Sequence, residues 1–120
     1  LERSPAEVAR FAAVVGHWAG DDGVVLVSVD LAHDVARTDA PRNDALCFDL
    51  LTSLDVQRIL RLDDRHMDAR PAVAIGITVA RDTGATGFVL VERTDSSQLE
   101  GFAGGTVTSY AAAYYAQARR

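Results

Sequence analysis

The sequence predicts one α/β domain, of the α+β or α/β class, in which helices flank a single sheet. Three observations predict it: a length of 120 residues, apolar residues at helical spacing near both ends, and apolar runs of strand length between them. A chain of this length buries enough surface to form one core without disulfides. We therefore expect residues 1–120 to form a single domain. Its predicted order is α-β-α-α-β-β-α, with three or more strands in the sheet, two of them in a hairpin.

The first predicted helix follows Ser4 and has recognisable signals at both ends. Ser4 is a suitable N-cap, Pro5 fits the first helical position, and Glu7 stands where a capping box requires an acid. Gly20 is typical of a helix end. One face carries apolar residues at helical spacing, namely Val8, Phe11, Ala12, Val15 and Ala19. We expect this face to pack on the core, with Trp18 sealing its edge.

The next apolar segments predict an interior strand and the central helices. Residues 24–29 (VVLVSV) are apolar on both faces of a strand, which is typical of a strand covered on both sides. A short helix or helical turn is expected over residues 30–37. Residues 44–62 have helical character, with a break at Thr52 and Ser53.

A hairpin and a terminal helix complete the predicted fold. Residues 71–80 (PAVAIGITVA) alternate between larger and smaller apolar side chains, a period typical of a strand. The small face of this strand, which includes Gly76, favours a close approach by another element. A turn with glycine leads to residues 88–94 as the return strand. Residues 106–120 are expected to close the chain as a helix.

The charge composition excludes several functions. The net charge is −5, and all twelve basic residues are arginines, so the chain contains no lysine. It therefore has neither a Schiff-base lysine nor a Walker-type phosphate lysine. The arginines are interspersed with aspartates and form no basic stripe, so no nucleic-acid binding is expected from this acidic protein. No apolar stretch reaches membrane-spanning length, so no membrane association is expected.

Cys47 is the single cysteine of the sequence. It cannot form an internal disulfide, which favours a cytoplasmic location. Its apolar surroundings predict a small core residue. A nucleophilic role would require the fold to bring a histidine beside it, and the candidates are His17, His33 and His66.

The most interesting polar cluster follows the predicted interior strand. Asp30, His33 and Asp34 lie within five residues, and such a set can ligate a divalent metal or share a proton. His66, in the polar stretch LDDRHMDAR, would join this site if the fold brought the two clusters together. The simpler interpretation is that Asp30 caps the following helix and that the second cluster is a hydrated linker.

A glycine loop before the last predicted helix is a second candidate site. Gly101, Gly104, Gly105 and Thr106 could present backbone N–H groups to a small anionic ligand, because helix N-termini bind anions. The alternative is a flexible turn whose threonine caps the helix.

Three tyrosines in the predicted last helix are candidate interface residues. Tyr110 and Tyr114 lie on its apolar stripe, where core packing is the simpler interpretation, and Tyr115 lies off it. An exposed aromatic among alanines favours association between helices. The preferred interpretation is a small non-catalytic interaction or regulatory module that acts as a homodimer. The alternatives are a metal-assisted hydrolase or lyase and a binding domain for an anionic small molecule. The sequence identifies no cofactor.

Overall fold

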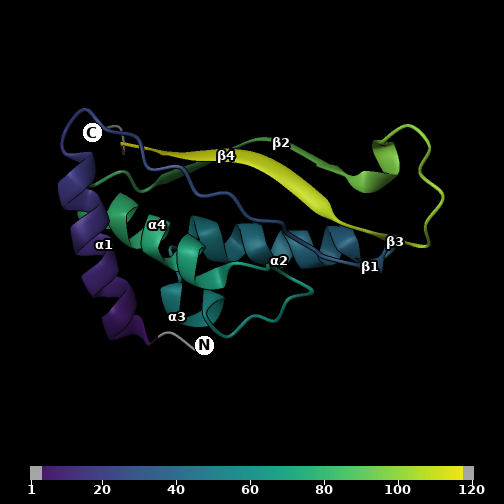
Figure 1. Cartoon of the computed structure of the whole chain (residues 1–120), viewed down its shortest axis with the longest axis horizontal. Helices are drawn as coiled ribbons and strands as arrows, with labels where there is room; N and C mark the ends of the chain where they lie inside the picture. The colour runs from purple at the N-terminus through teal and green to yellow at the C-terminus, as the bar shows by residue number, and fades with distance from the viewer. Residues whose placement is uncertain (1–3, 118–120) are drawn as a thin grey trace.

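The computed structural model describes residues 4–117, which form an α+β domain (Figure 1). Its elements follow in the order α1 (Pro5–Ala19), β1 (Val35–Ala36), α2 (Ala40–Thr52), α3 (Val56–Ile59), α4 (Arg70–Asp82), β2 (Gly87–Asp95), the 3-10 helix η1 (Ser96–Gln98), β3 (Thr106–Val107) and β4 (Ser109–Ala116). Between residues 4 and 117 the strands form two antiparallel pairs, β1 with β3 and β2 with β4. The α+β class is confirmed, but the predicted sheet of three or more strands is wrong for this part of the chain.

Helix α1 begins as its capping signals predict. The Ser4 hydroxyl accepts a hydrogen bond from the Glu7 N–H, and the Glu7 carboxylate accepts one from the Ser4 N–H at 3.0 Å. These bonds satisfy N–H groups that have no partner within the helix. Val8 and Ala12 are each 2% exposed, and α1 packs against α4.

The long helical segment is interrupted where the sequence predicts. Helix α2 ends at Thr52, and Asp55 starts α3 by accepting a hydrogen bond from the Arg58 N–H at 3.0 Å. Helix α2 begins earlier than expected, at Ala40. Pro41 lies in its first turn, where the missing proline N–H is not needed.

The strand predicted over residues 71–80 is wrong, because Arg70–Asp82 form helix α4. An apolar run of this length does not distinguish a buried strand from a buried helix, and Pro71 in the first turn favours the helix. Most of the helix circumference is covered, since its buried residues are Val73, Ala74, Ile77, Thr78, Val79 and Ala80. The close approach predicted at Gly76 does occur. A Cβ placed on it would lie 2.7 Å from Val27 Cγ2.

Residues 24–29, predicted as an interior strand, are extended but belong to no sheet. Their side chains alternate as they would in a strand. Val27 and Val29 pack against the core, whereas Val24 and Leu26 are 90% and 87% exposed. The segment therefore covers the core from outside, because its second face points to solvent.

The short helix predicted over residues 30–37 is also wrong. The Leu31 N–H donates to the Ser109 carbonyl at 3.1 Å, and the Ser109 N–H donates to the Ala32 carbonyl at 2.8 Å. The next residues, Val35 and Ala36, pair with β3. These bonds between distant segments satisfy backbone groups that a helix would otherwise have to satisfy internally.

The C-terminal helix predicted over residues 106–120 is wrong as far as Gln117, and residues 118–120 lie outside the described chain. Ser109–Ala116 form strand β4, which pairs with β2 along its full length with an irregularity between Leu90 and Glu92. The return strand expected over residues 88–94 is confirmed as part of β2, but its partner is β4. The tyrosines of β4 fit a strand, and pairing with β2 overrides the helix propensity of its alanines.

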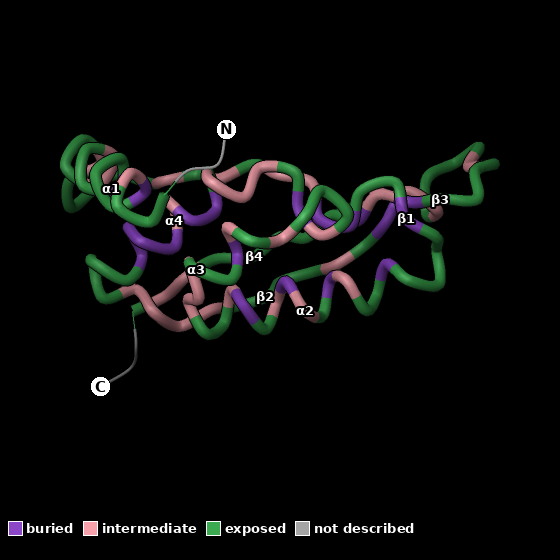
Figure 2. Tube along the Cα trace, turned by 90° about the horizontal axis from the view of Figure 1, so that it is seen from below, coloured by how far each residue is buried: buried purple, intermediate pink, exposed green. Residues whose placement is uncertain are grey.

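Figure 2 shows the buried residues as purple stretches along the helices and near β1. Two packed clusters lie among them. The larger cluster consists of Leu31, Cys47, Leu50, Ile59, Met67, Val73 and Ile77. The smaller cluster consists of Ala32, Val35, Ala40 and Val107. Cys47 is thus a core residue, as predicted. No helix within residues 4–117 is both long enough and apolar enough to cross a membrane.

Candidate functional site

The predicted group of Asp30, His33 and Asp34 does not close into a metal site. His33 Nδ1 lies 3.6 Å from Asp30 Oδ2, but the Asp34 carboxylate accepts a hydrogen bond from the Thr106 hydroxyl. Among the described residues, no three His, Cys, Asp or Glu side chains are grouped so that they could hold a metal ion. The simpler interpretation of Asp30 as a helix cap is wrong, because no helix follows it before Ala40.

His66 lies in a separate pair. Its Nδ1 is 2.7 Å from Asp63 Oδ1, and this hydrogen bond is the main reason why the pKa of the Asp63 carboxyl is lowered. The two predicted clusters do meet, but through backbone groups. The Asp30 N–H donates to Asp68 Oδ1 at 3.1 Å, and the Asp68 N–H donates to the Asp30 carbonyl at 3.2 Å. This contact joins the extended segment to the α3–α4 loop and leaves the two histidines beside different carboxylates.

The glycine loop lacks the helix on which the anion-binding hypothesis depends. Gly104 and Gly105 lead into strand β3, and Gly101 turns the chain with a φ of 79°. The Thr106 hydroxyl is already bonded to the carboxylate of Asp34. With the Asp34 carboxylate beside it and no aligned helix N–H groups, this loop is unfavourable for an anion.

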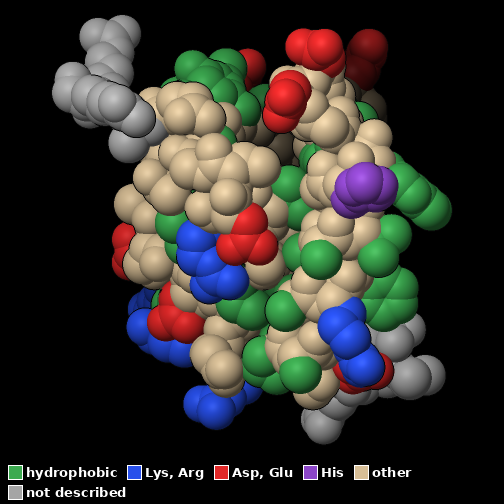
Figure 3. All heavy atoms as spheres, turned by 90° about the vertical axis from the view of Figure 1, so that its left-hand side faces the viewer, with side chains coloured by type: hydrophobic (Ala, Val, Ile, Leu, Met, Phe, Trp, Pro, Cys, Tyr) green, Lys and Arg blue, Asp and Glu red, His purple; other side chains and the backbone are tan. Residues whose placement is uncertain are grey.

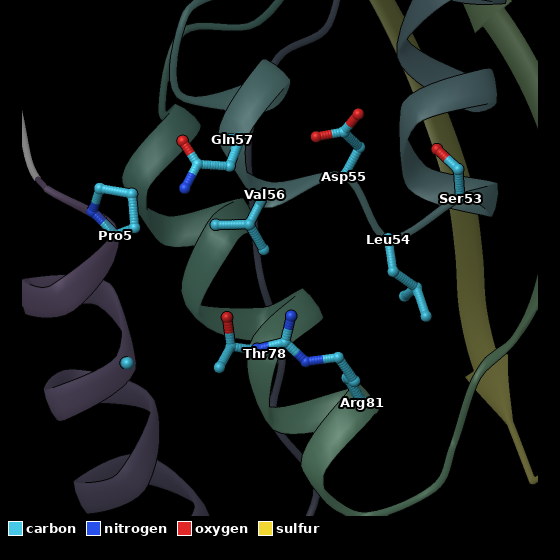
Figure 4. Close-up of a pocket in the computed structure, with 9 residues that line it drawn as sticks. Pro5, Ser53, Leu54, Asp55, Val56, Gln57, Thr78 and Arg81 are labelled. Atoms are coloured by element: carbon cyan, nitrogen blue, oxygen red, sulfur yellow. The ribbon is translucent and has the colours of Figure 1, made fainter.

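A shallow cleft of about 390 Å³ lies between the start of α1, the α2–α3 turn and α4 (Figure 4). Its lining residues are Pro5, Ala9, Ser53, Leu54, Asp55, Val56, Gln57, Thr78 and Arg81. The polar groups most relevant to chemistry already have structural partners. Asp55 caps α3, and the Thr78 hydroxyl donates to the Ala74 carbonyl at 2.8 Å. The cleft therefore brings together no nucleophile and base among the residues that line it.

Cys47 is held in a form that does not react. Its side chain is fully buried, and Sγ donates to the His66 carbonyl at 3.2 Å. Burial, followed by the negative charge of Asp44, raises the pKa of this thiol to about 12. Because the thiolate is the nucleophilic form, these surroundings exclude Cys47 as a nucleophile in the folded chain.

A buried ion-pair network, which the sequence interpretation missed, is centred on Arg93. The Arg93 guanidinium contacts the carboxylates of Asp44 at 2.7 Å and Asp95 at 3.0 Å, and it donates to the Ser109 hydroxyl at 3.0 Å. Asp44 also accepts from the Ala32 N–H at 3.4 Å. The signal in the sequence is an acid on the otherwise apolar face of α2. Since every member has a partner within the chain, the network is a structural link between α2, β2 and β4.

The strand assignment reverses the roles of the three tyrosines. Side chains alternate every two residues in a strand, so Tyr110 and Tyr114 lie on one face of β4 and Tyr115 on the other. Tyr115 points inward: its hydroxyl donates to the Leu51 carbonyl at 2.7 Å, and its ring lies 5.4 Å from that of Phe88. Burial raises the pKa of Tyr115. Tyr110 and Tyr114 are 39% and 54% exposed, so they, and not Tyr115, are available for contacts.

Apolar side chains gather on the outer face of the β2–β4 pair. We call this set the outer sheet face; its large members are Val89, Val91, Tyr110 and Tyr114. Val89 and Tyr114 lie opposite each other across the two strands, and Val91 is 65% exposed. Several large apolar side chains exposed on one face are typical of an interaction site.

Helix α1 carries a second group of exposed apolar residues. Trp18 does not seal the core edge as predicted, because it is 82% exposed; Phe11 and Val14 are about half exposed. In Figure 3, which views the end of the molecule that contains α1, hydrophobic side chains are interspersed with charged ones. Single apolar residues between charges are common on protein surfaces, so this group is the weaker candidate.

Comparisons with protein-family models, with curated proteins and with solved structures gave no match.

Proposed function

We propose that this protein is a small non-catalytic interaction module that acts as a homodimer through its outer sheet face. The observation that carries the proposal is the exposure of large apolar side chains on a sheet only two strands wide, with Val91 at 65% and Tyr114 at 54%. A two-stranded sheet open on one face is marginally stable by itself, and association covers the exposed apolar area.

The distribution of polar groups supports an interaction module over an enzyme. Within the described residues, the buried carboxylates and the cysteine are engaged in internal contacts, and His33 and His66 each lie beside a different carboxylate. The outer sheet face itself carries tyrosine, valine and alanine, with Glu92 opposite Ala112. Aromatic residues are enriched at protein interfaces.

Sedimentation equilibrium across the micromolar range tests the proposal. We expect the wild-type mass to rise with concentration toward that of two chains. Tyr114→Glu places a charge on the outer sheet face and should keep the protein monomeric, because a buried unpaired charge is costly. Trp18→Glu is the matched control, since Trp18 is also an exposed aromatic but lies on α1.

The control should dimerise as the wild type does. A wild-type protein that remains monomeric throughout would end the proposal. Dissociation by Trp18→Glu but not by Tyr114→Glu would move the interface to α1 and would equally contradict the outer sheet face.

A further inference from the structure

The extended segment 24–29 leads directly into contacts with the edge of β4 that faces away from β2. After it, the Leu31 N–H donates to the Ser109 carbonyl, and the Ser109 N–H donates to the Ala32 carbonyl. In Figure 1 the segment follows the course of β4 toward these contacts. Among residues 4–117, no backbone hydrogen bond links residues 24–29 to β4. The segment therefore forms a third row beside β4 and β2 that its side chains hold in place.

The side chains of this third row alternate in phase with those of β4. Val27 and Val29 pack against the core cluster that Tyr115 also contacts, so they lie on the inner side. Val24 and Leu26 lie on the opposite side and are almost fully exposed. They therefore extend the outer sheet face by one row. We define the three-row face as the outer sheet face together with Val24, Leu26 and Ser28.

Backbone contacts fix which residues of the three rows lie level with one another. Leu31 lies opposite Ser109, and counting antiparallel from this pair aligns the segment with β4. The pairing of β2 with β4 aligns the other side. Two levels of the three-row face, read from the segment through β4 to β2, are Ser28–Ala112–Glu92 and Leu26–Tyr114–Val89.

The third row adds a large share of exposed apolar surface. Specific dimers bury about 800 Å² on each partner. The large side chains of β2 and β4 on this face are between one-third and two-thirds exposed, whereas Val24 and Leu26 are almost fully exposed. A second copy that covers all three rows therefore buries considerably more apolar surface than one that covers β2 and β4 alone.

Glu92 is the one charged side chain among the outward-facing residues of the three-row face. Within residues 4–117 its carboxylate has no hydrogen-bond or ion-pair partner, and neither has the Ser28 hydroxyl. Burying a carboxylate without a hydrogen-bond donor is costly. An arrangement of two copies is therefore favourable only if it brings a donor to Glu92.

Two symmetric arrangements bring two such faces together, because a two-fold axis between packed sheets runs either across the strands or along them. An axis across the strands at Ala112 places each row on its own copy and sets the two Glu92 carboxylates against each other, which is repulsive. An axis along β4 places β4 on β4, and it places the extended segment of each copy on β2 of the other. This second arrangement separates the two carboxylates.

The axis along β4 also matches the levels of the two faces. Residues of the same level meet, so the Ser28 hydroxyl of one copy faces the Glu92 carboxylate of the other and can donate to it. Leu26 faces Val89 in the same way. The tyrosines of the two β4 strands meet at the centre, where aromatic pairs are favourable.

We propose that a second copy of this chain covers the three-row face, with β4 on β4 and with residues 24–29 of each chain on β2 of the other. This inference rests on the proposed homodimer and specifies its interface and its symmetry. The extended segment, which belongs to no sheet, is thereby an interface element as well as a cover of the core.

Substitution of Leu26 tests whether the third row belongs to the interface. Leu26→Glu should raise the dimer dissociation constant in sedimentation equilibrium at least about tenfold, because it buries a charge against Val89 of the other copy. The far-ultraviolet circular dichroism should be unchanged, since the Leu26 side chain is exposed. Leu99→Glu is the matched control, because Leu99 is an exposed leucine that follows η1 and lies outside the three-row face.

A spin label at the end of β4 reads the symmetry without touching the interface. Gln117→Cys places the label five residues beyond Ala112, and Cys47 is buried, so position 117 alone is labelled. An axis along β4 keeps the two labels at the same end of the dimer, within about 25 Å of each other. An axis across the strands at Ala112 sends them to opposite ends, about 35 Å apart. Double electron–electron resonance measures this distance.

The outcomes separate the two proposals. A protein that is monomeric at all concentrations overturns both. A dimer that tolerates Leu26→Glu, or that Leu99→Glu weakens equally, overturns the three-row face and leaves the homodimer intact. Labels about 35 Å apart contradict the axis along β4, whatever the effect of Leu26→Glu.

Discussion

Arg93 on strand β2 donates from Nε to the carboxylate of Asp44 on helix α2 at 2.7 Å, although the two residues are 49 positions apart in the sequence. Asp44 is 1% exposed, and the side chain of Arg93 is one-quarter exposed. Since a buried carboxylate needs a partner, this pair joins the sheet to the helical layer.

Removing the arginine should destabilise the fold strongly. Arg93→Met leaves Asp44 buried without its charge partner, and we expect a loss of about 3 kcal/mol in the free energy of unfolding in urea. Arg81→Met is the matched control. Its guanidinium is 3.7 Å from Asp82 and both side chains are more than half exposed, so its loss should stay below about 1 kcal/mol. Equal effects of the two substitutions would contradict the structural role of the Arg93–Asp44 pair.

Asp95 should make stability sensitive to acid. Hydrogen bonds from Ser97, followed by the contact with Arg93, lower the pKa of its carboxyl. In the unfolded chain the pKa of an aspartate carboxyl is about 3.9. The stabilisation of the fold by ionised Asp95 is therefore complete above that pH. It is lost as the pH falls through the lower pKa of the folded state. Asp95→Asn should therefore flatten the decline of stability below about pH 4.

The measurement for this prediction is the midpoint of urea unfolding at a series of pH values. Asp82→Asn serves as the control, because Asp82 is 60% exposed on its side chain. A wild type and an Asp95→Asn variant with parallel acid profiles would show that the ionised carboxylate contributes nothing to folding.

Cys47 should be inert until the chain unfolds. Its thiol pKa rises from 9.0 to about 12, which lowers the thiolate fraction near neutral pH about a thousandfold. A thiol reagent should therefore label the native protein far more slowly than the protein in urea. Labelling of the native protein at the rate of a free thiol would mean that the core around Cys47 opens readily.

The contact between Gly76 and the extended segment can be tested with two alanine substitutions. Gly16→Ala should stabilise the protein by up to about 1 kcal/mol, because its Cβ meets only Val79 at 3.9 Å and alanine favours a helix. Gly76→Ala should destabilise it by about 1 kcal/mol or more, because its Cβ would lie 2.7 Å from Val27 Cγ2.

Adding Val27→Ala to Gly76→Ala should recover part of that loss, since the clash is relieved. Urea unfolding of the two single variants and the double variant gives the coupling energy. If Gly76→Ala stabilises the fold as much as Gly16→Ala does, residues 24–29 do not pack on α4.

How far the sequence predicts this fold depends on whether the decisive signal is local. The start of α1, the break after Thr52 and the strand over residues 88–94 were predicted, because caps, turns and strong periodicity act within a few residues. The candidate sites were predicted less well. The Asp and His residues were identified, but their partners, Thr106 and Asp63 among them, depend on how the loops meet.

The amino-acid sequence by itself determined the helix boundaries near the N-terminus and the burial of Cys47. It also excluded a Schiff-base lysine and a Walker-type phosphate lysine. The tertiary structure alone decided that residues 71–80 are a helix and Ser109–Ala116 a strand. The physical reason is that short apolar or alanine-rich runs satisfy either backbone conformation, and the choice falls to whichever distant segment supplies the hydrogen bonds and the buried surface. Here β2 supplies them to β4, and this pairing turns Tyr110 and Tyr114 outward.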